Sequence, residues 1–251
     1  MRNKSLAVLF IVFILTVFAI PVFAGKADNV CGNVDIGFLR RHVNLPLQVS
    51  IASKTPVNNL CQVILNINGR YFTAYASDNY VMMGKMYSNR MLLDNPELAK
   101  LQKSTFTKVK SELDKCVAID YKPKGKIKNV VYMITDPVCP YCDMATKKIK
   151  KFVDDHHAEL KIVFFGVHGA ASNQKAIEAV CRNFTLAEYT EEDWKKDDSK
   201  EYQCQKGRDL IAKSQPVARR LHIQGVPTFF LQDGTQVVGA NMARLEKAVK
   251  K

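Results

Sequence analysis

The strongest structural signal in this chain is the stretch KNVVYMITDPVCPYC, residues 128–142. Its first half is apolar and rich in β-branched and aromatic residues, which is typical of a buried parallel strand. After Cys142, apolar residues at 144, 149, 152 and 153 recur at helical spacing among the lysines of residues 147–151. The sequence therefore places Cys139 and Cys142 where a strand turns into an amphipathic helix.

Two cysteines separated by two residues can open and close one disulfide. A helix start at Cys139 favours the thiolate form of this first cysteine. The same spacing also serves zinc sites, which need two more ligands. The nearby candidates are His156 and His157, and adjacent side chains on a helix point in different directions. We therefore predict a redox centre with no metal, whose only cofactor is its own redox-active disulfide.

The first 24 residues have the three parts of a secretory signal peptide. A basic start at Met1–Lys4 is followed by an apolar run over residues 5–23 and by Ala24 before the cut. The alternative is a retained anchor, because the apolar run approaches the length of a transmembrane span. Pro21 and the Val-x-Ala ending favour cleavage after Ala24. We expect an exported mature chain of residues 25–251.

Export changes the meaning of the cysteines, because disulfides persist in oxidising compartments. The chain has seven, and the five outside the Cys139–Cys142 pair leave one thiol over. A disulfide between Cys181 and Cys204 would restrain the polar, acidic insertion between them. A second candidate disulfide joins Cys31 and Cys61, and the candidate spare thiol is Cys116.

The charge is strongly basic, with a formal net value of +13. Removing residues 1–24, which contain Arg2 and Lys4 and no acid, leaves +11. Lysines alternate over residues 122–128 and cluster over residues 147–151. Such runs are usually solvated faces, and export argues against a nucleic-acid partner.

Residues 25–93 are expected to form a small α+β unit. A short helix over residues 36–43 leads to strand-like segments at 47–52 and 62–76, and Asn68-Gly69 between strand formers is a hairpin signal. A second turn over residues 77–79 precedes a strand from Tyr80. So small a sheet has exposed edges, which dimerisation would cover. The alternative is a monomer whose sheet packs on its own second domain.

Residues 94–120 are expected to be a linker helix. Asp94 is a candidate N-cap, Pro96 lies near the first helical position and Glu97 is an acid in the first turn. The apolar residues that follow have a loose three-to-four spacing. We expect a helix of about 20 residues, roughly 30 Å long, that acts as a spacer.

Residues 121–251 alternate strand and helix, which implies a parallel βαβ unit with a right-handed crossover. Strands are expected at 128–135 and 160–165, and helices at 140–155, 174–182 and 208–221. The order then changes to strand 228–231, a turn at Asp233-Gly234, strand 235–238 and a last helix from Ala243. A β-hairpin thus completes the sheet.

This order, with the Cys139-Pro140-Tyr141-Cys142 motif and Gly225-Val226-Pro227-Thr228, resembles the thioredoxin fold. The resemblance implies that Pro227 follows a cis peptide bond and faces the cysteine pair. The alternative is an ordinary trans proline at a strand start. It also implies that backbone groups of Val226 pair with an extended substrate, beside Pro140 and Tyr141.

The chain from about residue 45 onward is also similar to the periplasmic thiol:disulfide interchange proteins of the DsbC and DsbG type. The supporting features are the hairpin over residues 71–83, the linker helix, Thr135-Asp136 before the motif, and Cys181 with Cys204. This resemblance implies a homodimer joined through cystatin-like N-terminal domains, and a periplasmic location. It implies misfolded or disulfide-containing exported proteins as substrates, and recharging by a membrane thiol reductase of the DsbD type.

The expected activity is disulfide isomerisation, with Cys139 as an exposed nucleophile and Cys142 as the buried resolving thiol. Proline at position 140 gives the Cys-Pro-Tyr-Cys motif found in DsbG-like proteins and glutaredoxins, whereas DsbC-like isomerases carry glycine at this position. Val226 replaces the threonine common at its position. Both residues tune thiolate stability, so the redox potential and the preferred direction of the reaction stay open. The alternative within redox enzymes is a DsbG-like reductase that protects single oxidised cysteines. The alternatives from other classes are a mainly non-catalytic chaperone and a protein that holds a soft metal ion.

Overall fold

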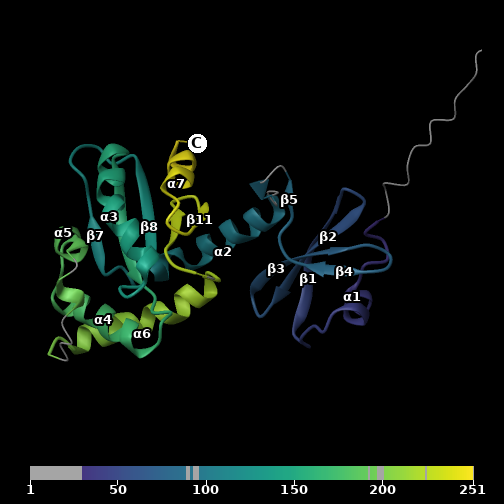
Figure 1. Cartoon of the computed structure of the whole chain (residues 1–251), viewed down its shortest axis with the longest axis horizontal. Coiled ribbons are helices and arrows are strands. Elements are labelled where there is room, and N and C mark those ends of the chain that lie inside the picture. Colours follow the sequence, from purple (N-terminus) through teal and green to yellow (C-terminus); the bar gives the residue numbers. More distant parts are fainter. Residues whose placement is uncertain are drawn as a thin grey trace, which may run out of the picture.

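The computed structural model describes residues 30–88, 91–92, 96–191, 193–196, 201–223 and 225–250. The expected signal peptide and the candidate N-cap Asp94 lie outside these residues. Within them, none of the helices combines the length and the apolar character needed to cross a bilayer. Figure 1 shows two units, with helix α2 running from one to the other.

The N-terminal unit is a four-stranded antiparallel sheet with one short helix. Its strands follow in the order β1-β2-β3-β4. Two tight turns join the first three strands, with positive φ at Asn58 and Asn59 and again at Asn68 and Gly69. The bounds are α1 Ile36–His42, β1 Val49–Val57, β2 Leu60–Ile67, β3 Arg70–Ala76 and β4 Val81–Met83, followed by a small β5–β6 ribbon of Tyr87–Ser88 and Met91–Leu92.

The core of this unit lies between α1 and one face of the sheet. Phe38 and Leu39 of α1 pack with buried residues of β2 and β3 such as Val63, Leu65 and Ala74. The helix begins at Asp35, whose carboxylate accepts a hydrogen bond of 2.6 Å from the Phe38 N–H. A small sheet with one helix buries little apolar surface, so added cross-links matter for its stability.

The C-terminal unit is an α/β sheet covered by helices. Its strands are β7 Ile119–Tyr121, β8 Asn129–Thr135, β9 Ala158–Phe164, β10 Thr228–Leu231 and β11 Gln236–Val238. Its helices are α3 Pro140–Asp155, α4 Ala170–Cys181, α5 Leu186–Thr190, η1 Asp193–Lys195, α6 Gln205–Arg220 and α7 Met242–Val249. The sheet order is β11-β10-β8-β9-β7. The parallel β8–β9 pair, joined by α3, and the antiparallel β10–β11 hairpin confirm the expected thioredoxin-like α/β fold.

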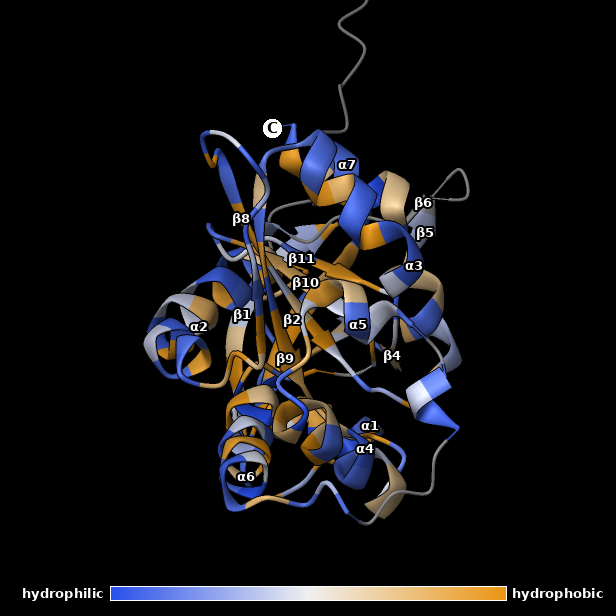
Figure 2. Ribbon diagram, turned by 90° about the vertical axis from the view of Figure 1, so that its left-hand side faces the viewer, coloured by the Kyte–Doolittle hydropathy of each residue, from blue (hydrophilic) through white to orange (hydrophobic). Residues whose placement is uncertain are grey.

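Alternation along the strands divides the core into two layers, because successive side chains in a strand point to opposite faces. Val131 and Met133 of β8 belong to the layer that contains α3 and α7. Tyr132 and Ile134 belong to the other layer, with α2 and the second half of α6. Figure 2 shows the resulting apolar strands between helices with polar outer surfaces.

Helix α2, Pro96–Asp114, differs from the expected spacer over residues 94–120. It ends six residues earlier, and residues 119–121 form the edge strand β7, because Ile119 is buried against β9. The helix is also packed into the C-terminal unit. The Phe106 ring stacks on Phe230 at 5.2 Å, and Val109 and Leu113 are buried in the same layer.

Polar contacts fix α2 in this position. Asp114, near its end, accepts hydrogen bonds from the Tyr132 hydroxyl at 2.6 Å and from Lys161 at 2.8 Å. Gly234 packs directly against the helix, and a Cβ there would lie 3.0 Å from the Lys103 Cα. At the other unit, the Tyr71 and His222 rings lie 5.9 Å apart, so the β2–β3 hairpin also reaches the C-terminal unit.

We predict that Phe106→Ala lowers the free energy of unfolding of the C-terminal unit by about 3–5 kcal/mol, because it leaves a cavity beneath β10 and β8. Lys108→Ala, at an exposed position of the same helix, is the control and should change it little. Urea unfolding followed by tryptophan fluorescence measures both. Equal stabilities for the two variants would show that α2 is a spacer after all.

Candidate active site

The two cysteines lie at the start of α3. Cys139 is the N-cap residue, and Pro140 is the first residue of the helix. The Cys142 N–H bonds to the Cys139 carbonyl at 3.0 Å, which places Cys142 one turn inside. Cys139 is 4% exposed, so the expected exposed nucleophile is largely covered. Its neighbours Pro140 and Tyr141 are the exposed residues of the motif.

The segment before β10 covers Cys139. The Val226–Pro227 peptide bond is cis, and the Cys139 thiol donates to the Val226 carbonyl at 3.8 Å. Pro227 is buried, and its carbonyl accepts the Gly239 N–H at 2.8 Å. The structure thus brings the Val226 carbonyl, at the cis bond before Pro227, against Cys139, while the Tyr141 side chain is 66% exposed.

The buried carboxylate of Asp136 holds the turn that leads from β8 to α3. It accepts hydrogen bonds from Val138 N–H at 2.9 Å, and from Val167 N–H, His168 Nδ1 and Ser172 Oγ at 2.8 Å each. Burial alone would raise the pKa of Asp136, but these bonds outweigh it and hold that pKa below the usual 3.8. The carboxylate therefore joins the motif to the segment after β9.

Cys142 lies in a polar recess behind the helix start. Its sulfur accepts the Asp136 N–H at 3.4 Å, and burial raises the pKa of its thiol well above the usual range. The Thr135 hydroxyl and the Asp136 N–H act in the opposite direction, because they favour the thiolate. Behind them lies Tyr189, which is fully buried. At pH 7 this thiol is therefore protonated.

The insertion between α4 and α6 supplies Tyr189. The helix α5 begins at Thr185, which forms a reciprocal capping box with Glu188. Lys195 of η1 then pairs with Asp143 of α3, one residue after Cys142. A disulfide between Cys181 and Cys204 closes the insertion at its base. Gly207 makes room for it, since a Cβ there would lie 2.8 Å from the Cys181 sulfur.

The remaining cysteines lie away from this site. Cys31 and Cys61 form a disulfide that ties the segment before α1 to β2. Cys116 is a buried free thiol in the layer of α2, on the opposite face of the sheet from α3, and burial raises its pKa. Among the described residues, no three side chains of His, Cys, Asp or Glu are grouped as a metal site.

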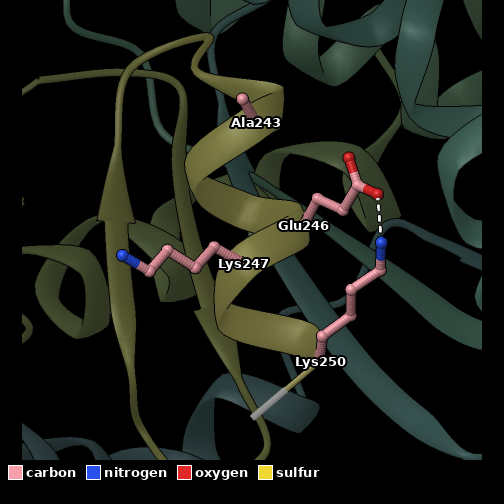
Figure 3. Close-up of a pocket in the computed structure, with 4 residues that line it drawn as sticks. All are labelled: Ala243, Glu246, Lys247 and Lys250. Carbon is pink, nitrogen blue, oxygen red and sulfur yellow. Dashed lines mark hydrogen bonds and ion pairs between the residues drawn. The ribbon is translucent and has the colours of Figure 1, made fainter.

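The hollow drawn in Figure 3 is not part of the active site. It is lined by Ala243, Glu246 and Lys247 of α7 and by its C-cap residue Lys250, and Glu246 and Lys250 form an ion pair of 2.5 Å. None of these lining residues belongs to the cysteine motif or to the segment before β10.

Sequence reasoning missed several residues of the site, namely the bonding role of Asp136, its partners His168 and Ser172, the Asp143–Lys195 pair, and Tyr189. One signal was present for Tyr189. Thr185 and Glu188 have the spacing of a capping box, and Leu186 and Tyr189 are apolar positions three apart. These features indicate a short buried helix within the otherwise polar insertion.

We predict that Asp136→Asn flattens the acid side of the stability profile. Because the folded pKa lies below the unfolded value, the carboxylate stabilises the fold above about pH 4, and that contribution is lost as pH falls through the folded pKa. The amide also leaves donors unpaired, at about 1–3 kcal/mol for each. Urea unfolding between about pH 2 and pH 7 measures both effects.

Ser172→Ala is the matched control for this prediction. It removes one donor and keeps the carboxylate, so its stability should be lower but should still fall with acid as in the parent protein. The same acid dependence in Asp136→Asn as in the parent protein would contradict the role given to Asp136.

Comparison with known proteins agrees with this fold. The family model of the thioredoxin-like domain matches residues 118–251, more than half of the chain. No curated protein matches the chain.

Among solved structures, the thiol-disulfide exchange protein alpha-DsbA2 from Wolbachia pipientis is 19% identical, with 62% of this chain and 98% of that chain covered and a TM-score of 0.50. The catalytic domain of Proteus mirabilis ScsC is 20% identical, with 59% and 96% covered and a TM-score of 0.47. Helicobacter pylori DsbG is 16% identical, with 73% and 93% covered and a TM-score of 0.36. On the evidence of the family model and the fold, the chain belongs to the thioredoxin-like domain family.

Proposed function

We propose that this protein is an exported thiol-disulfide oxidoreductase whose main reaction is the isomerisation of wrong disulfides in other exported proteins. The observation that carries the proposal is the cysteine pair at the start of α3. Cys139 is the N-cap residue of α3, and its thiol donates to the Val226 carbonyl. Cys142 lies one turn further into the helix, in the recess. One thiol is thus placed to meet a substrate and the other to displace it.

In the first step, the Cys139 thiolate attacks one sulfur of a substrate disulfide. The substrate S–S bond breaks, a mixed disulfide forms, and one substrate thiolate leaves. In isomerisation, another substrate thiolate attacks this mixed disulfide and releases Cys139, so no electrons are transferred overall. If the mixed disulfide stalls, Cys142 attacks Cys139, which reduces the substrate by two electrons and oxidises the pair. A membrane thiol reductase of the DsbD type would then restore both thiols.

The surroundings of Cys139 suit a polypeptide substrate. Tyr141 and Met144 on α3 and Val167 after β9 are large apolar side chains that are exposed near the motif. An extended peptide that pairs with backbone groups of Val226 beside Pro227 would lie across them. Binding of this kind depends on backbone shape and general apolarity, so it serves many different unfolded chains.

A second candidate is a reductase that protects single oxidised cysteines. Pro140 favours it, because the Cys-Pro-Tyr-Cys motif is the form of DsbG-like proteins. The two activities share Cys139 and differ in whether Cys142 completes each cycle. A chaperone activity of the same surface would persist after both cysteines are replaced by alanine, and suppression of aggregation by that variant would measure it.

We place the protein in the periplasm, with residues 1–24 removed. The disulfides Cys31–Cys61 and Cys181–Cys204 support an oxidising compartment, since such bonds are rare in the cytosol. The basic surface is given no nucleic-acid partner, because export separates the protein from nucleic acid.

We also propose a homodimer through the N-terminal unit, which would take the cystatin-like role. In the described part of the chain, β4 pairs only with β3 and so leaves one edge of the sheet open. Tyr80, Met82 and Met83 are large exposed apolar residues at this edge. Met82→Lys should yield monomers by light scattering, whereas Lys108→Ala should remain dimeric. A parent protein that is monomeric at all concentrations would contradict the dimer.

We predict that Cys139→Ser abolishes turnover of a scrambled-disulfide substrate, because it removes the attacking thiol. Cys142→Ser should retain attack and accumulate a mixed disulfide, visible as a higher-mass band on a non-reducing gel. Cys116→Ser is the control and should retain full turnover, since that thiol lies on the other face of the sheet. Turnover that survives in Cys139→Ser would refute the assignment.

A further inference from the structure

Among the residues that the structure describes, two buried hydroxyl groups have no hydrogen-bond partner of normal geometry within the protein. They are Thr135 Oγ1 and the Tyr189 hydroxyl, and both residues are completely buried. Buried polar groups are nearly always paired, and each unpaired hydroxyl costs stability. Two unpaired hydroxyl groups in one part of the core therefore indicate a role in a state of the protein other than the resting one.

Both hydroxyls lie on the Cys142 side of the sheet. Thr135 ends β8 and, by the alternation of the strand, points to the same face as Met133, the face that α3 covers. It pairs across the sheet with Phe164, whose ring lies 5.4 Å from the Tyr189 ring. The next residue, Asp136, directs its N–H at the Cys142 sulfur.

Electrostatic effects indicate the same neighbourhood. The Thr135 hydroxyl lies close enough to Cys142 and to Tyr189 to lower the pKa of each, against the larger effect of burial. Burial, and then the charge of a Cys142 thiolate, raise the pKa of Tyr189 far above 10. Tyr189 therefore remains a hydrogen-bond donor at every pH at which the protein works.

The other charged groups around Cys142 are already paired or belong to the motif. Asp136 is occupied by its four donors, and Asp143 is paired with Lys195, whose ammonium lies 5.6 Å from the centre of the Tyr189 ring. Cys139 faces Val226. Among the described residues, the Thr135 hydroxyl and the Asp136 N–H are donors that favour a charge on Cys142.

We propose that Thr135 is a further catalytic residue, which donates a hydrogen bond to the Cys142 thiolate during resolution of the mixed disulfide, with Tyr189 as the positioning residue behind it. This inference rests on the proposed function. Cys142 loses its proton, attacks Cys139 and forms the Cys139–Cys142 bond as the bond from Cys139 to the substrate breaks. The leaving substrate thiolate takes up one proton, so the substrate gains two electrons and the pair loses two.

The energetics give this arrangement a reason. A thiol buried in the recess would rarely ionise, so the resolving step needs hydrogen-bond donors that are already positioned where the thiolate charge forms. Hydroxyls that are unpaired beside the neutral thiol become paired only when the thiolate forms, which stabilises the ionised state selectively. The alternative is an imperfection in packing, which would cost stability without any effect on the rate.

The test is the rate of resolution measured with a chromogenic aryl disulfide as the substrate. In a Cys116→Ser background, attack by Cys139 releases one coloured thiolate, and resolution by Cys142 releases a second in a later phase. Loss of a donor to a charged group lowers the thiolate population about tenfold, and higher nucleophilicity of the remaining thiolate offsets part of this. For Thr135→Val we expect the second phase to slow about three- to fourfold, with the first phase unchanged.

Three further variants separate this role from a structural one. Thr135→Ser keeps the hydroxyl and should restore the second phase. Tyr189→Phe should slow the second phase less than Thr135→Val does. In the double variant it should cause no further slowing, because Tyr189 acts through Thr135. Both Thr135→Val and Tyr189→Phe should unfold at the same or higher urea concentration than the parent, because each removes an orphan hydroxyl.

Tyr132→Phe is the matched control, because its hydroxyl is bonded to Asp114 on the opposite face. It should lower stability and leave the second phase unchanged. An unchanged second phase in Thr135→Val, or slowing that Thr135→Ser fails to restore, would overturn the inference. A parent protein that releases only one equivalent would also overturn it, because Cys142 would then not resolve the adduct. A parent protein that releases no coloured thiolate would instead overturn the proposed function, because Cys139 would then not attack disulfides.

Discussion

The site depends on the four hydrogen bonds that the buried carboxylate of Asp136 accepts. They join the end of β8, the turn before α3, and the segment from Val167 to Ser172 after β9. Because the carboxylate is buried and ionised, moving any of these segments away would leave a buried charge with fewer donors. The Asp136 side chain therefore helps to hold the start of α3, which carries Cys139 and Cys142.

Around this fixed start, the fold gives the two cysteines different surroundings. The thiol of Cys139 donates to the Val226 carbonyl next to the exposed Pro140 and Tyr141, whereas the Cys142 sulfur accepts the Asp136 N–H in a buried recess. Helix α2 supports the sheet from the opposite side through Phe106 and Asp114. The N-terminal unit is thus attached through a helix that belongs to the core of the C-terminal unit. A dimer of N-terminal units would consequently hold the two active sites at a defined separation.

Local chemistry was enough to predict much of this from the sequence. The apolar run before Cys139, the Asn68-Gly69 turn and the strand order around Pro227 each depend on neighbours in the chain, and the α/β fold they predict is observed. The errors arose where distant segments decide. Residues 119–121 leave the expected helix because β9 offers a pairing edge, and Phe106 is buried because β10 lies beneath it. Tyr189 lies in a stretch whose composition is polar, and only the contact with Phe164 shows that it reaches the site.

We propose that Cys139 and Cys142 form the redox centre and that the Cys31–Cys61 and Cys181–Cys204 disulfides are structural. Alkylation trapping of the protein in intact cells, followed by peptide mapping, distinguishes the two kinds of cysteine. We expect Cys139 and Cys142 to be mostly reduced and to become alkylated, while the four cysteines of the two disulfides stay protected until a reductant is added. A Cys139–Cys142 pair found mostly oxidised would contradict the isomerase and indicate an oxidase. Alkylation of Cys181 or Cys204 in place of the pair would contradict the assignment of the redox centre itself.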